Sequence, residues 1–347
     1  MDVVDEIKRN IENAIFDLLP ENANKEWTSL SFEKTQTNND AFKTLLEPCR
    51  HLLSSGGKRW RPLLLSLCAN AIATKKNARC EIADFYKLAA LVELVHNASL
   101  IHDDIEDASN MRRGKKATHL AFGLDVALNA GSFLYFEAAT AIKKINANDE
   151  TKKVFFDLYL NELRTLHLGQ AADIFWHRNE TVFPRTSEYR EMVQNKTGTL
   201  SSLAVRLGFF AGGETLENAN VAGNVAREIG EAFQIIDDVK NLTTGNPGKK
   251  RGDDIVEGKK SLPVLLHVEK NPRDKEQIAN FFKDAKTNGI ASSAVENCIL
   301  LLEKSGSIGE ANEIGKKLLE KKTNEFLQFF ENENDKAKIK KLLKGIV

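Results

Sequence analysis

Two short acidic segments are the part of the sequence best suited to chemistry. The first, LIHDDIED at 100–107, places Asp103 and Asp107 four positions apart, with Asp104 beside them. On an α-helix, residues four apart share one face, and Asp104 is turned about 100° away from Asp103. Two carboxylates on one face repel each other unless a cation lies between them. Mg²⁺ is usually held by one or two carboxylates together with substrate phosphates. Alone, this segment could equally be a solvated helix end.

The second segment repeats the pattern. Residues 233–241 read FQIIDDVKN, with Asp237 and Asn241 at the same four-residue spacing and Asp238 between them. Both segments follow an apolar helical run, so each places its acids at the end of an apolar wall. Two matched copies weaken the solvated-surface interpretation. They predict two helices that face each other across one cavity, with about three metal ions binding a diphosphate between them.

Basic residues lie before and after the acidic segments in an order that suits a second diphosphate. Gly-rich GGKRWRP at 56–62 leads into a helix, whose N-terminus favours anions, although the spacing is not that of a P-loop. Arginine binds phosphate oxygens through two parallel hydrogen bonds. The candidate cations and their neighbours are Lys58, Arg61, Arg112, Arg113, Lys196, Thr197, Lys249 and Lys259.

A transition-metal site is the competing interpretation. Glu93 and His96 form a Glu-x-x-His pair of the kind found in di-iron bundles, but such a site needs two copies and the sequence has one. His102 precedes Asp103, yet no second imidazole lies at ligand spacing on that helix. His96 is better used as a hydrogen-bond donor to phosphate.

Helical periodicity dominates the chain, and most of the prolines lie at the edges of periodic segments. We expect one all-α domain over 1–347, a bundle of long antiparallel helices around a central cavity. Residues 270–290 are polar and suggest a surface excursion, and basic KAKIKKLLKGIV at the C-terminal end suggests a closing helix. The helical segments are 83–107, 124–146, 150–178, 186–212, 217–244, 291–305 and 308–331.

Composition excludes several classes of protein. Lys+Arg and Asp+Glu are both 49, so no basic excess supports nucleic-acid binding. No run of about 18 apolar residues predicts a membrane span, and the acidic N-terminal helix does not resemble a signal peptide. The four cysteines are widely spaced without a CxxC pair, which predicts reduced thiols and a cytoplasmic protein.

The ordered motifs resemble those of the trans-polyprenyl diphosphate synthases, of the isoprenoid synthase type I fold, over about residues 40–310. The local sequence is most like that of geranylgeranyl diphosphate synthases. The resemblance implies a homodimer that condenses isopentenyl diphosphate with dimethylallyl, geranyl or farnesyl diphosphate. The matching motifs are GGKRWRP (56–62), HNASLIHDDIEDASNMRRG (96–114), GQAADIFW (169–176), KTGTL (196–200), FQIIDDVKNL (233–242) and GKKRGDDIVEGKKSLP (248–263).

The resemblance also implies residue roles. Three Mg²⁺ ions, for which Mn²⁺ may substitute, would be held by Asp103, Asp104, Asp107, Asp237 and Asp238. Isopentenyl diphosphate would be held by Lys58, Arg61, His96 and Arg113. The allylic diphosphate would be contacted by Arg112, Lys196, Thr197, Gln234, Lys249 and Lys259, with Lys196 also counted as catalytic.

Two positions depart from the family pattern. Asn241 stands where many relatives carry Asp, which puts its role as a metal ligand in doubt, and Ser132 stands where relatives often have Asp after Gly. We expect the change at Ser132 to be a packing variation.

Product length is predicted from the helix that precedes Asp103. Ala98 and Ser99, five and four positions back, are small, whereas aromatic residues there stop growth at fifteen carbons in the family. The resemblance therefore favours geranylgeranyl diphosphate, with longer or shorter products as alternatives. Phe133, Tyr135 and Phe136 either cap the tunnel or belong to the core.

Two other functions remain as rivals. A class I terpene cyclase uses one diphosphate and needs no second basic site. An inactive regulatory subunit should lose acids from its motifs, and both Asp-Asp pairs are present.

Overall fold

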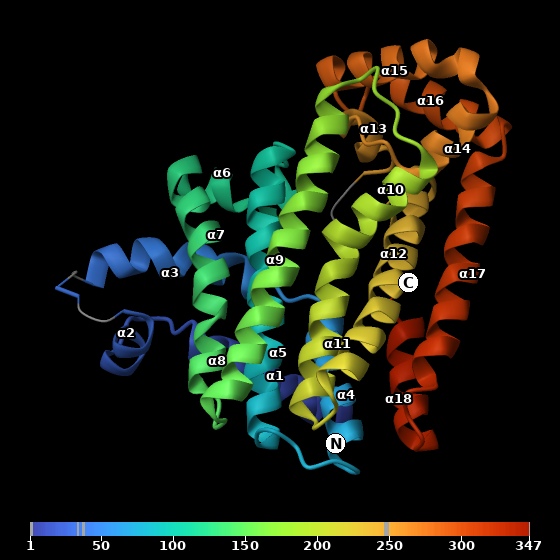
Figure 1. Ribbon diagram of the computed structural model, residues 1–347. Coiled ribbons are helices and arrows are strands. Elements are labelled where there is room, and N and C mark those ends of the chain that lie inside the picture. Colours follow the sequence, from blue (N-terminus) through green and yellow to red (C-terminus); the bar gives the residue numbers. More distant parts are fainter. Residues whose placement is uncertain (1–2, 33–34, 37–38, 246–249, 347) are drawn as a thin grey trace. The chain divides into compact units, whose positions relative to one another are not determined.

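A computed structural model describes residues 3–32, 35–36, 39–245 and 250–346 (Figure 1). The prediction of an all-α fold is confirmed, because the strands found in these ranges are the two-residue β1 (Met111–Arg112) and β2 (Lys115–Lys116). These strands pair antiparallel around a tight turn. None of the described helices is long and apolar enough to cross a membrane.

The chain packs as two compact units, and the expected single domain stays a prediction. The first unit comprises 1–161, 202–223 and 329–346, and the second comprises 162–201 and 224–328. Three helices supply residues to both units: α9 (Asp149–Arg178), α11 (Thr199–Ala211) and α12 (Leu216–Thr243).

The first unit is built around α5 (Ile82–Glu106), which packs against α1, α4 and α7. The N-terminus of α5 is capped by Asp84, whose carboxylate accepts a hydrogen bond from the backbone N–H of Glu81 at 3.3 Å. The predicted closing helix is α18, which packs on α4. The other helices of this unit are α1 (Val3–Leu18), α2 (Lys25–Ser31), α3 (Asn39–Leu53), α4 (Trp60–Ala73), α6 (Thr118–Phe122), α7 (Leu124–Ala138), α8 (Thr140–Lys144) and α18 (Glu333–Lys344).

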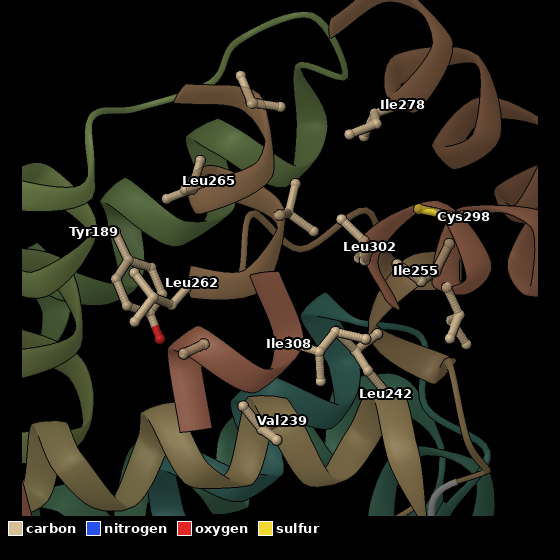
Figure 2. Packing of buried hydrophobic residues seen from close by; sticks show 14 of the residues in the cluster. Tyr189, Val239, Leu242, Ile255, Leu262, Leu265, Ile278, Cys298, Leu302 and Ile308 are labelled. Atoms are coloured by element: carbon tan, nitrogen blue, oxygen red, sulfur yellow. The ribbon is translucent and has the colours of Figure 1, made fainter. Parts of the chain in front are cut away.

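The second unit has its own hydrophobic core, where Tyr189, Leu242, Leu262 and Ile308 pack together (Figure 2). Its helices are α10 (Thr186–Val193), the π-helical turn η1 (Gln194–Gly198), α13 (Asp253–Glu257), α14 (Leu262–Lys270), the 3₁₀ turn η2 (Pro272–Asp274), α15 (Lys275–Asn288), α16 (Ser293–Lys304) and α17 (Ser307–Leu327).

Two expectations about elements were wrong in detail. The polar stretch 270–290 is not an excursion, because α15 buries Ile278, Phe282 and Ala285 in the core of the second unit. Their spacing of four and three residues is helical, but the surrounding charges hid it. The expected helix 124–146 is also divided, since α7 ends at Ala138 and α8 begins at Thr140.

Candidate active site

The acidic end of α5 turns its aspartates in two directions. Asp103 and Asp107 are partly exposed, and Asp107 is the residue that ends the helix. Asp104 is fully buried and accepts a hydrogen bond from Nε of Arg112 at 2.8 Å. Arg112 also approaches Asp103, at 3.7 Å. Burial alone would lower the pKa of Arg112, but its hydrogen bond and charge contact with Asp104 raise it. Asp103 and Asp107 therefore offer the hard oxygen ligands that suit a divalent ion, while Asp104 anchors the following hairpin.

The turn between β1 and β2 directs Arg113 back onto the 56–61 loop. Arg113 has a left-handed φ of 51° and donates a hydrogen bond to the backbone oxygen of Gly56. Its guanidinium lies flat against Gly57, where an added Cβ would come within 3.1 Å of it. Gly57 has φ +147°, which a side chain rarely adopts. The glycines of GGKRWRP thus allow an arginine to approach the backbone.

Three of the groups predicted to hold isopentenyl diphosphate, Arg61, His96 and Arg113, interact electrostatically in the first unit. The pKa of His96 lies well below its usual value, first because of desolvation and then because of the charges of Arg61, Arg113, Arg59 and Arg112. The charges of four arginines thus act on an imidazole that is neutral at pH 7. A neutral imidazole can still donate one N–H to a phosphate oxygen without adding to the repulsion among the cations.

Arg61 is, with Arg59, one of the two buried arginines of this group. Its side chain is buried, and its guanidinium lies 4.5 Å from the ring centroid of Trp60. Its Nε has no hydrogen-bond partner among the described residues. Burial lowers the pKa of Arg61 to about 10, so the group is still charged at pH 7. A buried cation whose donor lacks an acceptor is well suited to an anionic ligand.

Lys58, on the same loop, donates a hydrogen bond to the backbone oxygen of Ile346 at 3.0 Å. An ammonium group has three donors, so this contact leaves others for a ligand. Lys58 in the loop and Arg61 in the first turn of α4 lie on either side of Arg59 in the sequence.

Glu93 does not form half of a metal site with His96. Its carboxylate pairs with Arg59 at 2.6 Å and accepts a hydrogen bond from Nδ2 of Asn97 at 2.8 Å. The carboxylate is buried and serves the arginine cluster, which agrees with the preference for phosphate binding over di-iron chemistry.

The residues considered for product length occupy three different environments. Ala98 is fully buried, and Ser99 is partly buried and donates to the backbone oxygen of His96. Phe133 stacks on Phe32 with an interplanar angle of 10°, in an aromatic cluster with Trp27 and Phe42. This placement favours a core role for Phe133.

The two neighbouring aromatic residues differ from Phe133. Tyr135 is buried and stacks on His102, whereas Phe136 is 78% exposed, so it does not cap an internal tunnel in this structure. Ser132 accepts or donates a hydrogen bond with Nε2 of His102 at 3.3 Å. Ser132 therefore contacts the His102 ring, and the expectation of a packing variation stays a prediction.

In the second unit, a π-helical turn carries Lys196 and Thr197. Gly169 of α9 lies against it, and a Cβ there would stand 2.4 Å from the backbone nitrogen of Lys196. π-helical turns inside helices often occur at functional sites. The ammonium of Lys196 pairs with Asp173 at 2.6 Å, and Thr197 donates to Gln234 at 3.0 Å. The GQAAD segment thus supplies both the glycine that admits this turn and the carboxylate that orients Lys196.

The second acidic segment also has one buried and one more exposed acid. Asp238 is buried and accepts hydrogen bonds from the hydroxyl of Tyr189 at 2.6 Å and from Nε2 of Gln234 at 2.8 Å. Burial raises the pKa of Asp238 to about 6. Asp237 is only partly buried, so it is the better metal ligand of the two.

Asn241 has a structural task. It is buried, and its side-chain oxygen accepts a hydrogen bond from the backbone N–H of Asp254 at 3.2 Å. Lys259 lies near this turn and pairs with Glu257 at 2.5 Å and with Asp254 at 3.9 Å. Lys249 lies outside the described residues.

Sequence reasoning assigned no role to Asp173 or Tyr189. Asp173 lies within the GQAADIFW motif, so its place in that motif could have indicated a role at the site. Tyr189 carries no such signal, because its link to Asp238 is a contact between helices α10 and α12.

Asp103 and Asp237 belong to different units, and their meeting across one cavity stays a prediction. Within the described ranges, no group of three His, Cys, Asp or Glu side chains is placed to hold a metal ion.

Comparison with known proteins decides the family. The sequence model of the polyprenyl synthetase family matches residues 42–298. The chain belongs to this family. It is therefore a trans-prenyltransferase, an enzyme of a divalent-metal-dependent family that uses isopentenyl and allylic diphosphates. The family resemblance seen in the motifs is confirmed.

Individual relatives agree with this assignment. The enzyme is 34% identical to geranylgeranyl pyrophosphate synthase 2 of Zymoseptoria tritici over 269 residues, 77% of this chain and 76% of that protein. It is 34% identical to a geranylgeranyl diphosphate synthase of Methanosarcina mazei over 275 residues, 78% and 77% of the two chains. The crystal structure of geranylgeranyl pyrophosphate synthetase from Pyrococcus horikoshii superimposes on this chain with a TM-score of 0.82 and 31% identity. The alignment includes 99% of this chain and 96% of that one.

Proposed function

We propose that the enzyme makes geranylgeranyl diphosphate by adding isopentenyl diphosphate to an allylic diphosphate, with Mg²⁺ as its metal. The observation that carries the proposal is Arg61, a buried cation whose Nε has no hydrogen-bond partner among the described residues and whose charge helps to lower the pKa of His96. The names of the relatives at 34% identity support the twenty-carbon product, and the small Ala98 and Ser99 agree with it.

In the proposed reaction, Lys58, Arg61, His96 and Arg113 bind the diphosphate of isopentenyl diphosphate. Lys196, Thr197 and Gln234 bind the allylic diphosphate, with Arg112, Lys249 and Lys259 as further cations. Magnesium, when bound through Asp103, Asp107 and Asp237, supplies positive charge for the departing diphosphate. Asp104 and Asp238 position the first and second segments through Arg112 and Tyr189.

The bond between C1 of the allylic substrate and its diphosphate oxygen breaks. The double bond of isopentenyl diphosphate then attacks C1, and a proton is lost to form the new double bond. The chain's cations stabilise the charge on the leaving group where it develops. No side chain at the site stands out as the base, so we assign the proton to the released diphosphate.

We also propose a homodimer whose interface includes the face of α7 that carries Leu124, Leu128 and Phe136. These residues are 57%, 48% and 78% exposed and repeat every four or eight positions, so they form one apolar stripe. A second copy of the chain is the occupant that would cover this stripe in the same way on both partners. The four free cysteines are all buried, which is compatible with the proposed cytoplasmic location.

The test is product analysis with labelled isopentenyl diphosphate and, separately, dimethylallyl, geranyl and farnesyl diphosphate. We expect a labelled C20 product that depends on Mg²⁺ and on both substrates. Turnover of an allylic diphosphate without isopentenyl diphosphate would indicate a cyclase. Absence of turnover with every starter would indicate a non-catalytic subunit, and a dominant product of another length would overturn the C20 assignment.

A further inference from the structure

The loop that carries Lys58 leads into α4, whose first turn carries Arg61, and it is held by Arg59, a residue to which the motifs assign no role. Arg59 has φ 48°, in the left-handed region, and it immediately precedes α4. A residue with a side chain rarely adopts this conformation unless the surrounding contacts impose it. Because Arg59 directly follows Lys58 and is the N-cap of α4, its conformation sets the direction of the chain between Lys58 and Arg61.

The contacts of Arg59 explain how this conformation is maintained. Its guanidinium donates to the backbone oxygens of Leu53 at 2.7 Å and Gly56 at 3.3 Å, which fixes both ends of the loop. It also donates to Glu93 at 2.6 Å and to Glu12 at 2.7 Å. The side chain is only 4% exposed, so these charge-assisted bonds lie largely out of water.

Glu12 comes from a different part of the chain than its partners. It lies on α1, before the region 42–298 that matches the family, and α1 packs against both α4 and α5. Its carboxylate pairs with Nε of Arg59, while Glu93 pairs with the NH1 nitrogen. The two acids therefore hold the guanidinium from two of its edges and fix its plane.

We propose that Glu12 is a positioning residue for isopentenyl diphosphate, acting through Arg59 on Lys58 in the loop and on Arg61 in the first turn of α4. The inference rests on the proposed function of this loop. Glu12 touches neither substrate, and it sets the orientation of the arginine that shapes the loop. Its charge also offsets that of Arg59, one of the four arginines whose charges lower the pKa of His96. Without Glu12, Glu93 is the one carboxylate left in these contacts of Arg59. The guanidinium can then tilt, and the loop is held less firmly.

The test compares Glu12→Gln and Glu12→Asp with Glu6→Gln, which removes the same charge from an exposed position of the same helix. Binding of isopentenyl diphosphate is measured by calorimetry without an allylic substrate. KM values for both substrates and the unfolding temperature are measured in parallel. The side chain of Glu12 is 38% exposed, so Glu12→Gln should fold. If it does not, Glu12→Asp carries the test, because it keeps the charge and only shortens the reach to Arg59.

We expect Glu12→Gln to weaken binding of isopentenyl diphosphate roughly three- to tenfold, with a smaller effect for Glu12→Asp. The KM of the allylic substrate and the unfolding temperature should stay near those of Glu6→Gln. Equal losses for both substrates, or a loss that follows the unfolding temperature, would show a merely structural role. Unchanged or tighter binding in Glu12→Gln would overturn the proposal. Failure of the proposed function is separate, because the unaltered enzyme would then not bind isopentenyl diphosphate.

Discussion

The side-chain oxygen of Asn241 accepts a hydrogen bond from the backbone N–H of Asp254, at 3.2 Å, inside the second unit. Asn241 also accepts, through its backbone oxygen, a hydrogen bond from Gly252 at 2.9 Å. Asn241, at the end of the second acidic segment, thus stabilises the turn at Gly252–Asp254 that precedes Lys259. Its oxygen is already engaged, so we do not expect it to bind metal.

We therefore predict that Asn241→Ala lowers stability more than it lowers metal affinity. Loss of a buried acceptor should reduce the free energy of unfolding by about 1–2 kcal/mol, because the amide of Asp254 loses its partner. The Mg²⁺ concentration that gives half-maximal turnover should change less than about threefold. Urea unfolding and a magnesium titration measure the two quantities. A large rise in the Mg²⁺ concentration required for half-maximal turnover would identify Asn241 as a ligand.

The partly exposed aspartates should behave differently. Asp103→Ala or Asp237→Ala should lower turnover at least about a hundredfold. Each change removes an oxygen ligand of the magnesium whose charge stabilises the leaving diphosphate. The folded state should survive, since neither carboxylate is fully buried. Steady-state rates and circular dichroism check both points. Asp149→Ala, at an exposed position at the start of α9, is the charge-matched control. Turnover close to that of this control would refute the metal assignment.

The sequence predicts local features of this fold well, because they depend on residues close together in the chain. Helix α5 was expected over 83–107 and is found at Ile82–Glu106, since its apolar spacing and its acidic end are both readable. The family motifs likewise located the cations around His96. In contrast, the pairing of Arg112 with Asp104 and of Tyr189 with Asp238 depends on which elements meet. No spacing rule contains that information.

The same limit applies to the N-terminal segment. The amphipathic pattern of α1 indicates a helix, but it does not reveal that Glu12 reaches Arg59. The π-helical turn at Lys196 was also expected as plain helix over 186–212. Its geometry depends on Gly169 of another helix, which allows the backbone to come close.

Substitutions at Ser99 and Ala98 should both change the product length, but they should differ in their effect on stability. Ser99→Phe should shorten the main product, because an aromatic ring four positions before Asp103 would block the proposed tunnel. Ala98→Phe should do the same but lower stability by about 1–3 kcal/mol, since Ala98 is fully buried and the added ring overpacks the helix. Chromatography of the labelled products and thermal unfolding measure these effects. Ser99→Ala, which keeps the space open, serves as the control, and an unchanged product in Ser99→Phe would contradict the proposed tunnel direction.

The apolar stripe on α7 leads to a prediction about assembly. Phe136→Glu should shift the protein from dimer to monomer, because it places a charge in the centre of the proposed interface. Light scattering coupled to size exclusion gives the mass directly. Leu300→Glu on α16, where Leu300 is 51% exposed, is a control for a new charge at an exposed apolar position. Two outcomes would reject α7 as the interface: a Phe136→Glu protein that stays dimeric, and equal dissociation in both variants.

Glu137 should make stability depend on pH. It is buried on α7 and accepts a hydrogen bond from the indole N–H of Trp27 at 2.8 Å, and burial raises the pKa of its carboxyl to about 7. Between about pH 4.5 and 7 the folded state therefore binds a proton that the unfolded state has lost. The stabilising effect of that proton is lost as the pH rises through this window.

The Glu137→Gln variant isolates this effect, because glutamine keeps an acceptor for Trp27 but does not titrate. The free energy of unfolding, measured with urea at several pH values, should fall more steeply in the unaltered protein than in Glu137→Gln as the pH is raised from 4.5 to 7. Glu26→Gln, at an exposed position on α2, should leave the pH profile unchanged. Parallel profiles for the unaltered protein and Glu137→Gln would mean that Glu137 is already ionised in the folded state, with its charge compensated by Trp27, Ser31 and Thr140.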